Sequence, residues 1–307
     1  MTAVLETDSV SMAIGGATLV DAISLRIEAG EMIAIAGPNG AGKSTLLRLM
    51  SGDLRATHGA VRLKQRDIGA YAPRELALHR AMLSQHVSVT FPFTVEEIVA
   101  MGAGDNSRNT AQPLVDAALE EVGLNDFRDR KLPTLSGGEQ QRAHLARVLV
   151  QLACGEAVHG PGLLLLDEPT SSLDMRHQLD LVETARRRGR NGTAVVAILH
   201  DLNLAMCFAD RVILLHHGAM AADGSVRETI TAETIRRIFE VDATIEHTEN
   251  GIPFLLPQTM RRLASWPVSD DSDASLASGL RDEQLPASSS LRTQRPIPRD
   301  PSVKRGS

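Results

Sequence analysis

Residues Gly37 to Thr45 read GPNGAGKST, and this glycine-rich segment is the strongest indication of how the chain folds. It fits the pattern G-x-x-x-x-G-K-[ST], in which the backbone N–H groups of a glycine-rich loop cradle phosphate oxygens. The apolar run Met32–Ala36 before it is typical of a buried strand, and Lys43–Met50 after it is typical of a helix. Strand, glycine loop and helix together direct free N–H groups and the helix N-terminus toward an anion. We therefore expect a phosphate-binding core of the α/β class.

Two side chains of this loop have distinct expected roles. Lys43 places a positive charge beside the β- and γ-phosphates, and the Ser44 hydroxyl can ligate Mg²⁺. A glycine-rich turn with a surface lysine is the alternative, and the flanking strand and helix disfavour it. The expected nucleotide-binding residues of the loop are Gly37, Pro38, Asn39, Gly40, Ala41, Gly42, Lys43, Ser44 and Thr45.

A second apolar run ends in two carboxylates. Leu163–Leu166 precedes Asp167 and Glu168, and consecutive leucines are typical of a strand buried in a parallel sheet. Open α/β sheets bind ligands at the carboxyl ends of their strands. Asp167 is therefore expected to hold Mg²⁺, directly or through water, and Glu168 to polarise the attacking water. A core strand capped by two solvated acids is the alternative, which the glycine loop disfavours.

A third apolar run, Ala194–Leu199, is followed by His200. A lone histidine after a strand is more often structural than catalytic. Because His200 follows a strand that comes after the carboxylate strand, we expect it to contact the γ-phosphate.

A further motif is LSGGEQQR, at Leu135–Arg142. Together with the glycine loop it makes the chain similar to the ABC (ATP-binding cassette) ATPases, over about Val4 to Pro257. The resemblance implies a P-loop NTPase cassette with a mixed β core, an N-terminal antiparallel β subdomain and a helical subdomain. It also implies that Ser136, Gly137 and Gly138 cover the γ-phosphate of an ATP bound by the partner subunit.

The resemblance assigns further roles. Gln85 looks like the glutamine that senses Mg²⁺ and the attacking water, and Ser172–Asp174 looks like the D-loop. Asp167 and Glu168 resemble the Walker B aspartate and the catalytic glutamate, and His200 resembles the switch histidine. The expected catalytic residues are thus Glu168, His200 and Gln85, and the expected Mg²⁺ ligands are Ser44, Gln85 and Asp167.

One position departs from the family pattern. The family usually carries an aromatic ring in the N-terminal strand region that stacks on adenine, and Ile14 stands there instead. An aliphatic side chain still packs on adenine, but the stacking contribution of about 0.5–1.5 kcal/mol is lost. We expect the change to affect adenine selectivity and not phosphate binding.

Composition and charge exclude several classes of protein. The chain has 307 residues with 43% apolar, enough for a full core, and its net charge of −6 argues against a general nucleic-acid binder. Cys154 and Cys207 lie in apolar surroundings, which predicts free thiols in a reducing compartment. There is no apolar run of about 20 residues and no secretion signal. We therefore expect a cytosolic protein whose membrane association comes through a partner.

The chain divides by its motifs into a cassette domain, residues 1–264, and a disordered tail, residues 265–307, where Ser, Asp, Pro and Arg dominate. A helical subdomain is expected at about 85–155. The expected elements elsewhere are a strand at Ser24–Glu28, a capped helix at Thr94–Met101, two strands around Gly218 within Arg211–Gly224, a helix at Thr231–Val241, and a hairpin at Ala243–Leu256 turning at Asn250-Gly251.

One run of basic residues and one pair of adjacent histidines are expected to have structural roles. Arg186–Arg190 (RRRGR) follows a helical stretch, so we expect a solvated helix end. His216 and His217 resemble haem or metal ligands, but neighbours in a strand point to opposite faces. On that ground we expect them not to act together.

The segment Leu83–Gly102 indicates what the ATPase drives. It places Phe91 and Phe93 in a chain with 3% aromatic residues, together with Val87 and Val89, so it needs a surface against which to bury them. In the family this loop faces the coupling helix of a membrane subunit. Its sequence is similar to that of the ATPases of iron–siderophore, cobalamin and haem importers, and most of all to the haem-import members. The extra residues between the signature motif and the carboxylate strand, Val150–Gly162, are a second similarity to these members.

This resemblance implies an ATPase that couples ATP binding and hydrolysis to haem uptake, with ATP and Mg²⁺ as cofactors. It implies a homodimer, two membrane permease subunits, an indirect periplasmic haem-binding partner and no nucleic acid. The expected location is the cytoplasmic face of the bacterial inner membrane.

Other functions remain open at this point. A ferric-siderophore or cobalamin importer would carry the same ATPase, which never touches the cargo. A soluble ABC ATPase of DNA repair would need long coiled-coil heptads, which are absent, and translation members usually carry two cassettes. A soluble ATPase of cluster assembly fits the length, and co-purification with a membrane protein would distinguish it. A binding module without turnover is disfavoured by Glu168 and His200.

Overall fold

The computed structural model describes residues 3–85, 89, 91–249 and 251–263. The predicted disordered tail, Val87 and the turn residue Asn250 lie outside the described residues, so those expectations stay predictions. The division into a cassette domain with an inserted helical part also stays a prediction, and the elements below are described within residues 3–263.

The centre of the fold is a six-stranded sheet. Its strands, in spatial order, are β10 (Ala219–Ser225), β9 (Arg211–His216), β3 (Met32–Ala36), β8 (Ala194–Ile198), β7 (Leu163–Asp167) and β6 (Arg80–Leu83). All neighbours are parallel except β10, which runs antiparallel to β9. Every residue of β3, β7 and β8 is buried, which explains their uninterrupted apolar sequences.

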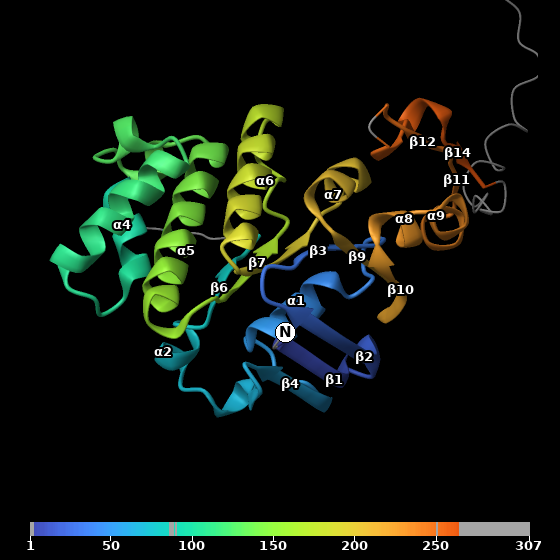
Figure 1. The fold of residues 1–307 in the computed structure, drawn as a ribbon, viewed down its shortest axis with the longest axis horizontal. Coiled ribbons are helices and arrows are strands. Elements are labelled where there is room, and N and C mark those ends of the chain that lie inside the picture. Colours follow the sequence, from blue (N-terminus) through green and yellow to red (C-terminus); the bar gives the residue numbers. More distant parts are fainter. Residues whose placement is uncertain (1–2, 86–88, 90, 250, 264–307) are drawn as a thin grey trace, which may run out of the picture. The chain divides into compact units, whose positions relative to one another are not determined.

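Alternation along these strands divides the core in two. Ile33 and Ile35 of β3 pack with the N-terminal strands and α1 (Lys43–Ser51), while Ala34 and Ala36 pack with the larger helices. This follows from the two-residue period of a strand. Figure 1 shows α1 and the blue N-terminal strands on one side of the central sheet and α5, α6 and α7 on the other.

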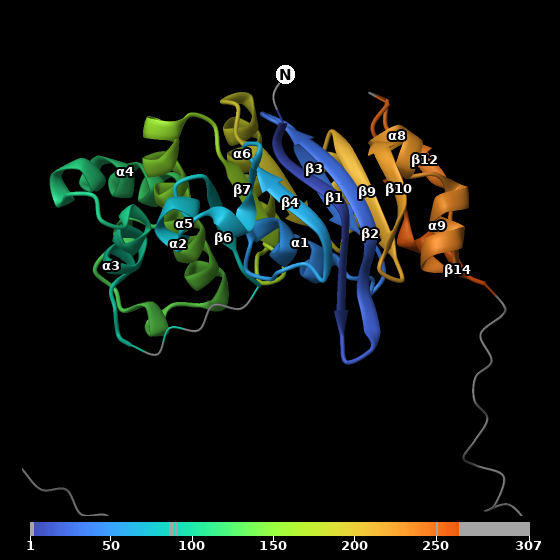
Figure 2. The same ribbon diagram turned by 90° about the horizontal axis from the view of Figure 1, so that it is seen from below.

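The N-terminal strands form a second, antiparallel sheet, as the resemblance implied. Its order is β2 (Ala17–Glu28), β1 (Ala3–Ile14), β4 (His58–Leu63) and β5 (Arg66–Asp67). A turn at Gly15 and Gly16, both with positive φ, joins β1 to β2. Figure 2 shows the long blue hairpin of β1 and β2 beside β4.

The helical part lies between β6 and β7 in sequence. It contains α3 (Val95–Ala100), α4 (Arg108–Glu121) and α5 (Gly137–His159), and α2 (Pro73–Leu76) precedes β6. The predicted threonine cap is confirmed: the Thr94 hydroxyl accepts from the Glu97 N–H, and the Glu97 carboxylate accepts from the Thr94 N–H. This reciprocal pair starts α3 at the predicted residue.

The remaining elements follow β7. They are α6 (Met175–Arg190), α7 (Leu202–Phe208), α8 (Val226–Thr229), α9 (Ala232–Phe239), β11 (Val241–Asp242), β12 (Ile245–His247), β13 (Pro253–Leu255) and β14 (Arg261–Arg262). The predicted strand pair around Gly218, the helix after Thr231 and the C-terminal hairpin are confirmed.

The basic run Arg186–Arg190 ends α6 as predicted, and Arg187 and Arg190 are exposed, as expected of a solvated helix end, but Arg186 and Arg188 are only partly exposed. Arg188 donates to Glu121 at 2.7 Å, with both side chains largely buried. The Arg186 guanidinium donates to the Cys207 carbonyl. The run therefore connects α6 to the end of α4 and to α7, contacts between segments that local sequence cannot show.

The reason given for dismissing the histidine pair is also wrong. β9 ends at His216, and His217 has φ +49° in the following turn, so strand alternation does not apply to it. The two rings are in contact, with centroids 4.0 Å apart and planes at 53°.

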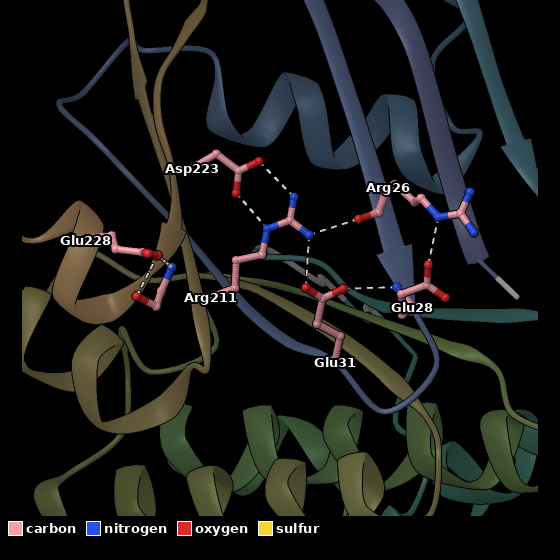
Figure 3. Close-up of polar contacts among 7 residues, drawn as sticks. Arg26, Glu28, Glu31, Arg211, Asp223 and Glu228 are labelled. Atoms are coloured by element: carbon pink, nitrogen blue, oxygen red, sulfur yellow. Dashed lines mark hydrogen bonds and ion pairs between the residues drawn. The ribbon is translucent and has the colours of Figure 1, made fainter. Parts of the chain in front are cut away.

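A polar cluster connects the two sheets (Figure 3). The Arg211 guanidinium, at the start of β9, pairs with both Asp223 carboxylate oxygens at 2.6 and 2.7 Å and with Glu31 at 2.9 Å. It also donates to the carbonyl of Arg26 on β2 at 2.9 Å. These bonds raise the pKa of Arg211 above its ordinary value, its hydrogen bond with Asp223 being the largest cause. One side chain thus links β9, β10, the β2–β3 turn and β2.

Candidate functional site: a phosphate-binding edge

The predicted site residues gather at one edge of the central sheet. β3, β8 and β7 are adjacent and parallel, so their carboxyl ends lie together. Gly37 follows β3, Asp167 ends β7, and His200 lies two residues after β8. This is the edge at which open α/β sheets bind ligands.

Two glycines of the loop are required by close backbone approach. A Cβ on Gly37, which has φ +145°, would lie 2.2 Å from the Leu215 carbonyl oxygen. A Cβ on Gly42, which has φ +94°, would lie 2.2 Å from the Leu19 carbonyl oxygen. Side chains at either position would push the loop away from the strands behind it, so these two positions of the motif are explained by packing as well as by phosphate approach.

The Lys43 side chain is buried against the glycine loop to which it belongs. Its Nζ donates to the carbonyls of Gly37 at 2.9 Å and Pro38 at 2.8 Å. Burial lowers the pKa of the Lys43 ammonium, and the Glu168 and Asp167 carboxylates oppose that shift. A cation held this close to the loop can meet a phosphate that the loop cradles.

Ser44 and Asp167 form the expected cation-binding pair. The Ser44 hydroxyl donates to Asp167 Oδ1 at 3.1 Å, although the two residues are 123 positions apart. Burial raises the pKa of Asp167, and its hydrogen bond with Ser44 is the main opposing influence. A hydroxyl beside a buried carboxylate is an oxygen ligand set of the kind that Mg²⁺ prefers, so these side chains fit the ion.

Of the three residues predicted to be catalytic, Gln85 and His200 both contact Glu168. The Gln85 amide donates to Glu168 Oε2, and His200 Nε2 lies 2.5 Å from Glu168 Oε1. Glu168 has φ +50°, a left-handed conformation that is uncommon for a residue other than glycine. The orientation of the Glu168 carboxylate is therefore set by its left-handed backbone and by its contacts with the two side chains.

The signature motif lies at the start of the 23-residue helix α5. Ser136 is its N-cap and forms a reciprocal pair with Glu139. Gly137 is exposed, and a Cβ there would meet nothing within 4 Å. Its surroundings leave room for an anion to approach the N-terminus of the helix.

Some contacts of the site escaped the sequence reasoning. Gln141 of the signature donates to the Pro169 carbonyl at 2.6 Å, and the Ser171 hydroxyl donates to the Glu168 carbonyl at 3.2 Å. Both hold the turn that carries Glu168. Pro169 was a usable signal, because a residue before proline has a restricted backbone, but it does not specify a left-handed conformation.

The structure also places two other predicted positions, Asp174 and Ile14. Asp174 of the D-loop caps α6 by accepting from the His177 N–H at 2.9 Å. Ile14, in the position of the adenine-stacking ring, ends β1 and is 56% exposed. Its exposure leaves the side chain free to contact a base.

Comparison with known proteins agrees with this geometry. Residues 20–171 match the family described as ABC transporter. The "Hemin import ATP-binding protein HmuV" of Rhodopseudomonas palustris strain BisA53 is 67% identical over 272 residues, covering 89% of this chain and 98% of that protein. The chain belongs to the ATP-binding subunits of ABC transporters. The protein of the same name from Bradyrhizobium diazoefficiens is 69% identical over 86% of this chain and 98% of its own length.

Solved structures of ABC ATP-binding subunits share the fold. A metal-chelate type ABC transporter in an inward-facing conformation matches with a TM-score of 0.68 at 23% identity, covering 86% of this chain and 98% of that one. The ADP conformation of an ATP-binding cassette matches with a TM-score of 0.66, also at 23%, over 78% and 99%. Among the residues that the structure describes, no helix of this ABC subunit is both long and apolar enough to cross a bilayer.

Proposed function

We propose that this ABC subunit hydrolyses ATP to drive haem uptake through partner membrane subunits. The observation that carries the ATPase part is Glu168, which lies between Gln85 and His200 beside the loop of Lys43. Support for haem as cargo comes from relatives at 67% and 69% identity that are named hemin import ATP-binding proteins.

The proposed chemistry assigns one role to each side chain. The loop N–H groups and Lys43 hold the β- and γ-phosphates of ATP, and Glu168 accepts hydrogen bonding from the attacking water. Gln85 and His200 keep the Glu168 carboxylate in place, and His200 contacts the γ-phosphate as the bond to ADP breaks. Phosphoryl transfer demands positioning and charge stabilisation more than covalent help, which is what this arrangement offers.

Ser44 and Asp167 would hold Mg²⁺. Gln85, which contacts the neighbouring Glu168, would respond to the presence of the same ion. The ion would neutralise charge on the β- and γ-phosphate oxygens. The fit rests on the 3.1 Å contact between the Ser44 hydroxyl and the Asp167 carboxylate.

Two copies of the chain would sandwich two ATP molecules. The exposed Gly137, with Ser136 and Gly138, would cover the γ-phosphate bound by the other copy. The dimer would sit at the cytoplasmic face of the inner membrane on two permease subunits, which receive cargo from a periplasmic haem-binding protein.

The decisive test is transport by the whole complex. The chain is co-expressed with the permease from the same genome and reconstituted in vesicles that contain ATP. Accumulation of haem, abolished by Glu168→Gln, is the expected result. Accumulation of a ferric siderophore or cobalamin in its place would contradict haem as the cargo, and failure to co-purify with any permease would contradict the importer.

A further inference from the structure

The turn that follows β7, residues 168–173, has a backbone that needs support from other elements. Glu168 has φ +50°, and a left-handed residue other than glycine persists only where its surroundings hold it. Within the turn, the Ser171 hydroxyl donates to the Glu168 carbonyl at 3.2 Å. This bond spans only three positions, so the placement of the whole turn depends on contacts with the helices beside it.

The contact that comes from α5 lies next to Glu168 in the chain. Gln141 Nε2 donates to the Pro169 carbonyl at 2.6 Å, and Pro169 is buried. The proline ring fixes φ at this residue, so a displacement of its carbonyl is passed on to the backbone of Glu168. The Gln141 amide therefore acts on the direction of the Glu168 carboxylate through a single stiff residue.

The helix α5 also packs tightly on the same turn. A Cβ on Gly138 would lie 3.0 Å from the Ser172 carbonyl oxygen, so the first residues of α5 lie directly against the turn. Gln141 lies three positions further along, on the same side of the helix. α5 thus contacts the turn at two points, and only the contact of Gln141 is a hydrogen bond given by its side chain.

The other end of the Gln141 amide shows that stability is not the reason for this side chain. Gln141 Oε1 is buried and has no hydrogen-bond partner among the residues that the structure describes. A buried acceptor without a partner costs stability, and an apolar side chain of the same length would avoid that cost. The bond that Gln141 donates is therefore the property that distinguishes it from such a side chain.

We propose that Gln141 is a positioning residue for ATP hydrolysis, whose bond to the Pro169 carbonyl sets the direction in which Glu168 faces the attacking water. The inference deepens the proposed function and rests on the role of Glu168 in it. The helix whose exposed start would cover the partner's ATP thereby also orients the carboxylate that acts on this chain's own ATP.

The first experiment measures steady-state ATP hydrolysis by the full chain with Gln141→Met. Methionine keeps the length of the side chain and removes the N–H donor. We expect kcat to fall at least about tenfold, because a small displacement of a catalytic group is enough to slow the reaction. The KM for ATP should stay unchanged, because Gln141 acts through Pro169 and not on the phosphate loop.

Gln151 provides the matched control on the same helix. It is half-buried, as Gln141 is, and its amide donates to the carbonyls of Ala77 and Arg80, each at 3.0 Å. It lies ten positions further along α5, about 15 Å away. Gln151→Met should leave kcat unchanged even where it lowers the melting temperature. An unchanged kcat in Gln141→Met, or an equal loss of kcat in both variants, would overturn the proposal.

The pH dependence of a second variant separates a lost donor from a changed shape. In Gln141→Glu the side chain keeps its shape, but it can donate to the Pro169 carbonyl only when its carboxyl group is protonated. The rate relative to the unaltered chain should therefore rise as pH falls from about 8 to about 5.5. The relative rate of Gln141→Met should stay constant over this range. A constant relative rate in Gln141→Glu would also overturn the proposal.

One further measurement keeps this inference apart from the proposed function. In the Glu168→Gln background, ATP should dimerise the chain with or without Gln141→Met, because Ser136–Gly138 and the phosphate loop are unchanged. Loss of that dimer through Gln141→Met would place Gln141 in dimer closure and overturn its positioning role. Near-normal hydrolysis by Glu168→Gln would contradict the proposed function itself, whereas a slow Glu168→Gln beside a normal Gln141→Met would contradict only the role of Gln141.

Discussion

At the scale of single residues, Glu168 is the side chain on which the proposed hydrolysis depends most. Glu168→Gln keeps its size and removes the charge that orients water, so turnover should fall by about 10²-fold or more. ATP binding should persist, because the loop and Lys43 are unchanged. Phosphate release and nucleotide affinity measured on one preparation check this.

The control for this variant is Glu183→Gln on α6, where the carboxylate is 56% exposed. It should leave the rate unchanged. A Glu168→Gln protein that hydrolyses ATP at a near-normal rate would remove Glu168 from the role given to it.

His144 gives a second prediction at this scale, concerning pH. It is 5% exposed on α5, and neither ring nitrogen has a hydrogen-bond partner within the described residues. Burial, and then the nearby Arg147, lower the pKa of His144 to about 4. The unfolded chain therefore binds a proton between pH 6.5 and 4 that the folded chain does not, and stability falls as pH drops through this window.

The expected loss from this one group is about 2 kcal/mol between pH 8 and pH 5, by linkage between the two pKa values. His144→Leu should remove that component, since leucine has similar bulk and no proton to bind. Urea unfolding at both pH values measures it, with exposed His58→Leu as the matched control. Equal acid sensitivity in the His144→Leu and unaltered chains would show that His144 is not responsible.

At the scale of secondary-structure elements, Arg211 joins strands that are far apart in the chain. Arg211→Met should leave the largely buried carboxylates of Asp223 and Glu31 without their cation (Figure 3). Removing one partner of such a group costs more than the pair contributes. We expect the free energy of unfolding to fall by about 2 kcal/mol or more, measured by urea denaturation.

The matched control is Arg26→Met in the same cluster. The Arg26 side chain is 57% exposed, and its pairs with Glu6 and Glu28 are screened by water. Arg26→Met should therefore lower the free energy of unfolding clearly less than Arg211→Met does. If both variants lost the same stability, the burial of the Arg211 pairs would not be the cause.

The loop after Gln85 gives a prediction in two halves. Phe91 is 68% exposed, whereas Phe93 is half-buried and packs on the helical core, with the two ring centroids 6.1 Å apart. Phe91→Ala should weaken co-purification with the permease and leave the melting temperature unchanged, because its ring is free for a partner. Phe93→Ala should lower the melting temperature, because it leaves a cavity.

The two variants serve as controls for each other, with ATP affinity as a shared readout. Loss of stability in Phe91→Ala would place that ring in the core. Unchanged assembly in Phe91→Ala would remove it from the contact with the membrane subunit.

At the scale of the whole molecule, the proposed ATP sandwich requires a second copy of the chain to face the exposed start of α5. Gly137→Asp should fold normally, since a Cβ there meets nothing within 4 Å. Its carboxylate would repel the phosphates of an ATP bound by the partner. In the Glu168→Gln background, ATP should dimerise the chain, and Gly137→Asp should abolish that dimer while ATP binding persists. Light scattering after size exclusion measures the mass.

Asn125→Asp adds the same charge at another exposed position of the helical part and should leave the dimer intact. A dimer that persists in Gly137→Asp would contradict a sandwich closed by the signature motif.

The features that could be predicted from the sequence are those that depend on neighbouring residues along the chain. The glycine loop between a strand and a helix, the threonine cap at Thr94 and the all-apolar strands were predicted at nearly their observed residues. Each depends on backbone preference, on capping over three positions, or on uninterrupted burial, and these act within a few residues. The glycine loop and the apolar runs indicated the site residues that follow them, the family resemblance added Gln85 and Ser136–Gly138, and the strand order accounts for the edge shared by the residues that follow β3, β7 and β8.

Tertiary structure alone decided the contacts between distant segments. The left-handed backbone of Glu168, the contact between the His216 and His217 rings, and the pairing of Arg188 with Glu121 have no local signature. Glu121 and Arg188 are 67 positions apart. Such groups meet only after the sheet and helices have packed, and the burial that follows packing then sets their charges and conformations.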